Sequence, residues 1–126
     1  MDSRFTDLKT VCAYEGLSDE ERRHGINLLE GHAPPTVCYG YACLLRGALA
    51  ERFNLLSDSV MTKNRGRQEG AGLLVKLLDD HKGEALSNDD VSRGLLGISR
   101  PGHTCETLLA AYLKYRRYLE TRRQAA

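Results

Sequence analysis

Hydrophobic residues recur along the chain at spacings of three and four, the pattern of helices that each bury one face. No segment alternates apolar and polar residues for long enough to predict a strand. The longest apolar pattern runs from about Thr36 to Phe53 and predicts a central helix. We therefore predict an all-α fold, a compact bundle of about five to six helices around this central helix.

Local signals predict where several helices begin and end. Ser18 and Glu21 form a capping-box pair, in which each side chain bonds the other residue's backbone amide, so a helix should begin there. Gly31 is expected to be the C′ residue after that helix. Pro34 and Pro35 cannot continue a helix but are well suited to start the next one.

Two glycines in the predicted central helix raise a question about helix packing. Gly40 and Gly47 both fall in the central helix, where each lowers helix propensity by about 1 kcal/mol relative to Ala. Either a neighbouring helix packs closely there, or the two glycines are simply tolerated.

Residues 57–72 are polar and glycine-rich, which predicts a flexible loop. Further helices are predicted over residues 73–81 and 87–97.

Length and composition narrow the class of protein. The 126 residues are close to the usual size of one domain, so we expect a single helical domain over residues 1–126. Hydrophobic residues make up 41% and charged residues 28%, which excludes collagen-like, membrane-spanning and strongly disordered chains. Four cysteines without a signal peptide favour reduced thiols, and we expect a cytoplasmic protein.

Basic charge gathers in two segments. Residues 63–76 hold four basic side chains against one acidic, and residues 113–126 hold five against one. These segments predict a basic loop and a basic C-terminal helix, the latter over about residues 104–123. Both could contact phosphates, although a solvated helix face is the alternative. The candidate nucleic-acid-binding residues are Lys63, Arg65, Arg67, Lys114, Arg116, Arg117, Arg122 and Arg123.

One cysteine is a candidate for chemistry. Cys105 falls in the first turn of the predicted last helix, where the helix dipole lowers a thiol pKa, and His103 is close enough in sequence to act as a base. No third residue that would orient this pair can be named. The cysteines and histidines show no metal-ligand spacing, and no cofactor motif is present, so we expect neither metal nor cofactor.

Three functions follow from these observations. The first is a small non-enzymatic regulatory or adaptor protein that acts by protein–protein contact on a partner of unknown identity. It would form a homodimer through the apolar face of Tyr112, Tyr115 and Leu119. The second is a nucleic-acid-binding regulator that uses the two basic segments. A Cys-dependent enzyme is the minor alternative.

Overall fold

A computed structural model describes residues 3–53, 59–81 and 103–125, with side chains described over 8–53, 60–81 and 103–121. Within these ranges the chain forms five helices and no strand, which confirms the all-α prediction. The helix predicted over residues 87–97 lies outside the described residues. The five helices are α1 (Ser3–Cys12), α2 (Asp19–Glu30), α3 (Pro35–Phe53), α4 (Ser59–Asp80) and α6 (Cys105–Ala125).

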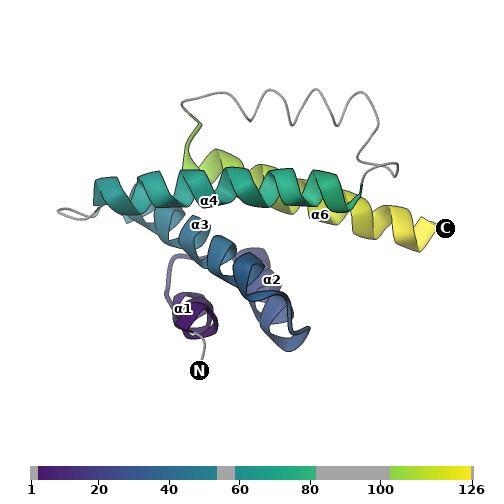
Figure 1. The fold of residues 1–126 in the computed structure, drawn as a ribbon, viewed down its shortest axis with the longest axis horizontal. Helices are drawn as coiled ribbons and strands as arrows, with labels where there is room; N and C mark the ends of the chain where they lie inside the picture. The colour runs from purple at the N-terminus through teal and green to yellow at the C-terminus, as the bar shows by residue number, and fades with distance from the viewer. Residues whose placement is uncertain (1–2, 54–58, 82–102, 126) are drawn as a thin grey trace.

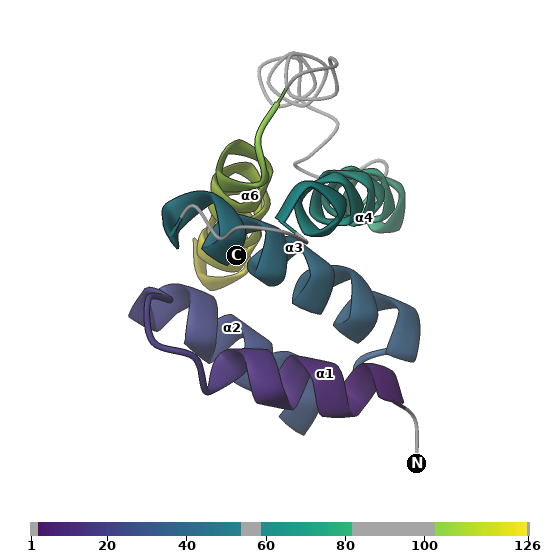
Figure 2. The ribbon, with the colours of Figure 1, turned by 90° about the vertical axis from the view of Figure 1, so that its left-hand side faces the viewer.

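Helix α3 lies in the middle of the arrangement. Helices α4 and α6 run beside each other on one side of it, and α1 and α2 lie on the other (Figure 1, Figure 2). Helix α3 packs against all four of them, as predicted for the central helix. Its Tyr41, Leu44 and Leu45 are fully buried, because a helix that is apolar on all sides can be covered on all sides.

The glycines of α3 mark places where other helices approach closely. An added Cβ at Gly40 would lie 3.2 Å from a methyl carbon of Leu73 in α4. An added Cβ at Gly47 would overlap the sulfur of Cys105 and lie 3.2 Å from the Cα of Gly66. Of the two explanations for these glycines, close helix packing is therefore correct.

The prediction of a flexible loop over residues 57–72 is wrong from Ser59 onwards, because the chain there is the first half of α4. Two of the glycines that suggested a loop face the neighbouring helices. A Cβ at Gly66 would lie 2.9 Å from the carbonyl oxygen of Cys43, and one at Gly70 would lie 2.7 Å from a methyl carbon of Leu44. Close packing compensates for the poor helix propensity of these positions.

Helix α2 begins and ends with capping motifs. The Ser18 hydroxyl accepts from the Glu21 amide at 3.1 Å, and the Glu21 carboxylate accepts from the Ser18 amide at 2.8 Å, which confirms the capping box. The prediction for Gly31 is wrong by one residue, since Gly31 has φ −81° and His32 has the left-handed φ of 53°. The Ala33 amide donates to the Leu28 carbonyl at 2.9 Å and closes a Schellman-type ending.

A partly buried ionic cluster, here called the Arg52 junction, joins α2, α3 and α6. The Arg52 guanidinium donates two hydrogen bonds to Glu21, at 2.8 and 2.6 Å, and also bonds Glu106. Burial alone would raise the pKa of Glu21, but hydrogen bonds from Arg52 and Ser18 outweigh it and hold that pKa below its ordinary value. The buried carboxylate is therefore charged and fully paired.

The neighbouring residue, Glu51, caps the start of α6. Its carboxylate accepts from the backbone amides of Cys105 and Glu106, both at 2.9 Å. The first amides of a helix have no partner within it, so an acid from another helix satisfies them here. Residues 51 and 52 together fix the last turn of α3 against the first turn of α6.

Candidate protein-binding groove

A groove runs along the exposed side of the α3–α4 contact and ends at the turn between α1 and α2. It consists of two hollows, of about 150 and 340 Å³, which share Arg46 and Thr62. We call the two hollows together the α3–α4 groove. Its lining residues are Tyr14, Glu15, Cys43, Arg46, Leu49, Phe53, Met61, Thr62 and Arg65.

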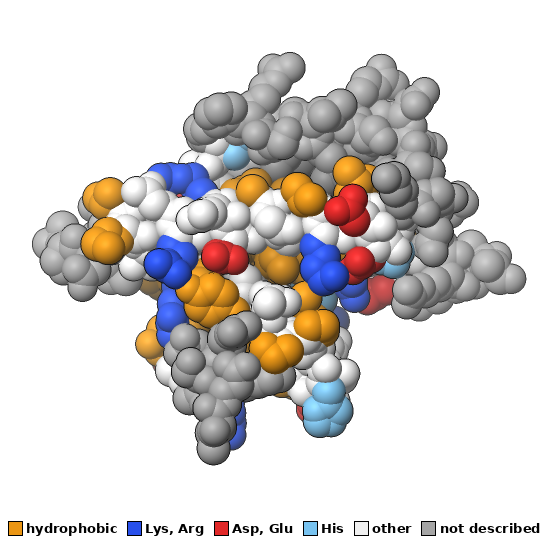
Figure 3. All heavy atoms as spheres, viewed as in Figure 1, with side chains coloured by type: hydrophobic (Ala, Val, Ile, Leu, Met, Phe, Trp, Pro, Cys, Tyr) orange, Lys and Arg blue, Asp and Glu red, His pale blue; other side chains and the backbone are white. Residues whose placement is uncertain are grey.

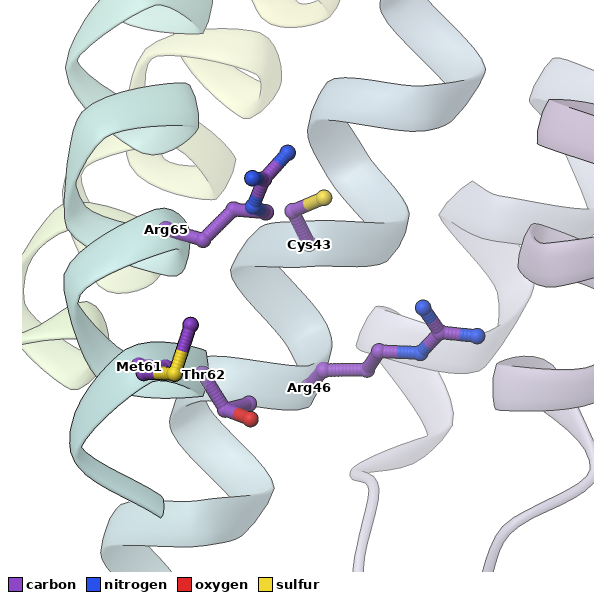
Figure 4. Close-up of a pocket in the computed structure, with 5 residues that line it drawn as sticks. All are labelled: Cys43, Arg46, Met61, Thr62 and Arg65. Atoms are coloured by element: carbon purple, nitrogen blue, oxygen red, sulfur yellow. The ribbon is translucent and has the colours of Figure 1, made fainter. Parts of the chain in front are cut away.

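Helical spacing brings these residues together. Cys43 and Arg46 are three apart on α3, and Met61 and Arg65 are four apart on α4, so each pair shares one side of its helix. Arg65 extends from α4 towards Cys43, whereas Arg46 extends away from α4 towards the N-terminal helices (Figure 4). The groove is therefore lined by side chains from both helices over the closely packed Gly47–Gly66 contact.

The groove has walls formed by α3, by α4 and by the turn between α1 and α2. Two arginines hold this turn in place. Arg22 donates to the carbonyl oxygens of Cys12 and Tyr14, both at 3.0 Å, and Arg52 donates to that of Gly16 at 2.8 Å. Gly16 has φ 93°, and a Cβ at this residue would overlap the Phe53 ring. Hydrogen bonds from both arginines therefore hold this turn in place.

Large hydrophobic side chains around this groove are exposed to solvent. The exposed fraction is 47% for Tyr14, 55% for Phe53 and 76% for Met61, and Val60 beside Met61 is 64% exposed. Figure 3 shows hydrophobic side chains at the N-terminal end of α4 and just beneath it, with basic side chains among them. Aromatic residues, Met and Arg are the residue types enriched at protein interfaces.

Two arginines and one acidic residue line the groove. They are Arg46, Arg65 and Glu15. Arg65 is exposed and donates a hydrogen bond to the Tyr39 hydroxyl. Burial raises the pKa of the Cys43 thiol, so this cysteine adds no negative charge near neutral pH.

The predicted basic residues of segment 63–67 do not form one patch. Residues two apart on a helix project about 200° apart, so Arg65 points away from both Lys63 and Arg67. The Lys63 carbonyl accepts from the Cys105 thiol at 3.3 Å, and Arg67 bonds Asn64. Only Arg65 of these three lines the groove.

The predicted basic residues of α6 also face different neighbours. Arg117 pairs with Glu20 of α2 at 3.3 Å, and the Lys114 ammonium lies 5.9 Å from the centre of the Tyr115 ring. Arg116 lines pockets between α6 and other helices. The side chains of Arg122 and Arg123 lie outside those described. Nucleic-acid binding by these residues stays a prediction from the sequence.

The predicted dimer interface is wrong as a surface. Tyr112, Tyr115 and Leu119 are only 3, 5 and 6% exposed and belong to the core of the chain itself. The Tyr112 hydroxyl also bonds the Nε2 atom of His24 at 3.0 Å. An apolar helix face needs a covering surface, and here other helices of the same chain provide it.

The pKa of the Cys105 thiol is shifted in the direction opposite to the prediction. It is fully buried, and burial together with the nearby Glu51 carboxylate raises its pKa to about 12. The prediction of a thiolate at this helix start is therefore wrong, because desolvation outweighs the helix dipole. All four cysteines of the chain are buried, and none forms a disulfide.

No protein-family model, no curated protein and no solved structure matches the chain. In the part of the chain that the structure describes, no group of three or more His, Cys, Asp or Glu side chains could hold a metal ion. No described helix is both long enough and apolar enough to cross a membrane.

Of the residues that line the groove, Arg65 was singled out from the sequence, as a nucleic-acid-binding candidate, but the groove itself was not predicted. A usable signal is the pair Val60 and Met61, two large apolar residues at the start of a mostly polar segment. Arg46 and Tyr14 carry no such signal, because their place at the groove depends on contacts between distant segments.

Proposed function

We propose that this protein is a small non-enzymatic regulatory or adaptor protein that binds a partner protein in the α3–α4 groove. The observation that carries the proposal is the exposure of Tyr14, Phe53 and Met61 around hollows whose walls are held by Arg22 and Arg52. Apolar side chains gain stabilisation when a partner removes them from water, and a backbone already held in place limits the cost of ordering the site.

The occupant we propose is an acidic segment of the partner that also carries apolar side chains. The exposed Arg65 guanidinium favours a carboxylate, which it can bind through paired hydrogen bonds. The hollow of about 340 Å³ between Tyr14, Leu49 and Phe53 has room for an apolar anchor residue. Alternating acidic and apolar residues in the partner would meet both features.

A phage-displayed peptide library selected on the full-length chain tests this proposal. We expect the selected peptides to be rich in Asp and Glu interleaved with Leu, Ile, Met or Phe. The affinity of a synthesised peptide, measured by fluorescence anisotropy, should fall at least tenfold in Met61→Asp.

The matched control is Val75→Asp, on the same helix. Val75 is also an exposed hydrophobic residue, at 58%, and lies fourteen positions after Met61, which corresponds to about 21 Å along a helix. This variant should bind the peptide as tightly as the unchanged chain. Equal loss in both variants, or selected peptides without acidic residues, would overturn the proposal.

Light scattering on the same samples tests the other occupant of the groove. If the unchanged chain is a dimer and Met61→Asp is a monomer, the groove holds a second copy of the chain, and the proposed acidic partner is wrong. A monomer in both cases, with peptide binding lost in Met61→Asp alone, supports the proposal.

A further inference from the structure

A second pocket, separate from the α3–α4 groove, lies where α2, α3, α4 and α6 meet near the first turn of α3. Its volume is about 250 Å³. Its apolar lining includes Leu28, Val37, Leu73 and Leu77, and Arg116 of α6 lines the same pocket. We call it the Arg116 pocket.

Arg116 has an unmet hydrogen-bonding requirement. Its Nε atom is buried and has no hydrogen-bond partner within the part of the chain described. A buried donor on a charged group is destabilising unless an acceptor reaches it. A ligand oxygen that bonds this guanidinium from the pocket would offset part of that penalty.

The other polar groups of the pocket already have partners. The Lys76 ammonium pairs with the Asp80 carboxylate at 3.3 Å, and the Tyr112 hydroxyl bonds His24. Burial lowers the pKa of His24 to about 4, with Arg116 adding to the effect, so His24 is neutral near pH 7. The Lys76–Asp80 pair has no net charge, and within the described residues no ion pair is seen for Arg116, which also lines a second pocket with Glu20 and Glu120.

We propose that the Arg116 pocket binds a small apolar carboxylic acid, whose carboxylate accepts hydrogen bonds from the Arg116 guanidinium while its hydrocarbon part contacts Leu28, Val37, Leu73 and Leu77. A guanidinium matches a carboxylate through two parallel hydrogen bonds. The pocket is smaller than the range of about 300–1,000 Å³ common for small-molecule sites, so the ligand is short. This proposal does not depend on the groove.

An NMR titration of the full-length chain with hexanoate tests it. The two matched probes are hexan-1-ol, which has the hydrocarbon chain without the charge, and acetate, which has the charge without the chain. We expect hexanoate to bind at least tenfold more tightly than either probe and to shift the Nε–H resonance of Arg116.

Two variants and a control assign the site. Arg116→Gln should weaken hexanoate binding at least tenfold, and Arg116→Lys should weaken it as well, because lysine keeps the charge but loses the paired donors. Arg117→Gln is the control, since Arg117 pairs with Glu20 and does not line this pocket. It should bind hexanoate like the unchanged chain.

Any of three results would overturn the proposal. The first is equal binding of hexanoate and hexan-1-ol, and the second is equal binding of hexanoate and acetate. The third is an unaltered affinity in Arg116→Gln or Arg116→Lys. If Arg116→Gln does not fold, the Arg116→Lys variant and the Arg116 resonance of the unchanged chain still decide the question.

Discussion

Two neighbouring residues at the end of α3 reverse the usual distribution of polar and apolar side chains. The Arg52 side chain is only 23% exposed and lies in an ionic cluster, whereas Phe53 is 55% exposed. Arginine is ordinarily at the surface and phenylalanine inside. Arg52 can be largely buried because Glu21 and Glu106 pair with its charge, whereas Phe53 lies at the edge of the groove.

Arg52 and Phe53 therefore have different roles, one in stability and one in binding, although they are neighbours in one helix turn. The junction holds α2, α3 and α6 together, so changes there should lower stability. The exposed side chains around the groove, Tyr14, Phe53 and Met61, lie outside the buried core, so changes there should alter binding with a smaller effect on stability. The following experiments test this division, starting with the largest expected effect.

Arg52→Met should lower the free energy of unfolding by about 3 kcal/mol, because it leaves the buried Glu21 carboxylate without its partner. Urea unfolding followed by circular dichroism measures the change. Arg117→Met removes an exposed ion pair with Glu20 and should cost less than about 1 kcal/mol. Similar losses in the two variants would mean that the junction does not stabilise the fold in the way argued above.

Gly66→Ala should lower the free energy of unfolding by about 2 kcal/mol, because the new methyl group would lie 2.8 Å from the Cys105 sulfur and force α3, α4 and α6 apart. Gly72→Ala on the same helix meets nothing within 4 Å and should raise stability by up to about 1 kcal/mol. Thermal unfolding of both variants measures the contrast. A stabilised Gly66→Ala chain would contradict the close contact beneath the groove.

Stability should fall by roughly 1 kcal/mol between pH 6.5 and 5.5 because of His24. Its pKa is about 4 in the folded chain and ordinarily 6.5, so in this window the unfolded chain takes up a proton that the folded chain does not. The lowered pKa of Glu21 acts in a different window, since its contribution is lost only as the pH falls below about 4.5. Urea unfolding at several pH values measures the slope, and His24→Gln should flatten it. An unchanged slope in that variant would assign the effect to other groups.

Met61→Asp should change the free energy of unfolding by no more than about 0.5 kcal/mol, because Met61 is 76% exposed. This is the smallest expected effect on stability, paired with the largest expected effect on peptide binding. Urea unfolding and anisotropy on one preparation compare the two. A loss of several kcal/mol would show that the groove rim belongs to the folding core.

Features with a local cause were predicted from the sequence. The Ser18–Glu21 capping box, the central helix and the C-terminal helix all rest on contacts within a few residues or on a simple apolar period. The loop predicted around Gly66 and Gly70 failed because glycine there serves contacts with α3 and α6. Helix propensity alone does not account for the stabilisation that these contacts between helices provide.

The candidate sites were harder to predict than the helices. The amphipathic face of Tyr112 and Tyr115 is evident in the sequence, but whether its partner belongs to the same chain is a question of tertiary structure. The contact of Arg52 with Glu21 and Glu106 joins residues 31 and 54 positions apart, for which no short motif exists. The groove depends on the same long-range packing.

The burial of the four cysteines makes the chain suited to site-specific labelling. Thiol reagents act on accessible thiolates, and burial raises the pKa of Cys12, Cys43 and Cys105. A cysteine introduced at the exposed Val75 would therefore react first, with no native cysteine removed. The native thiols would become reactive only when the core opens, so their rate of modification would report on unfolding.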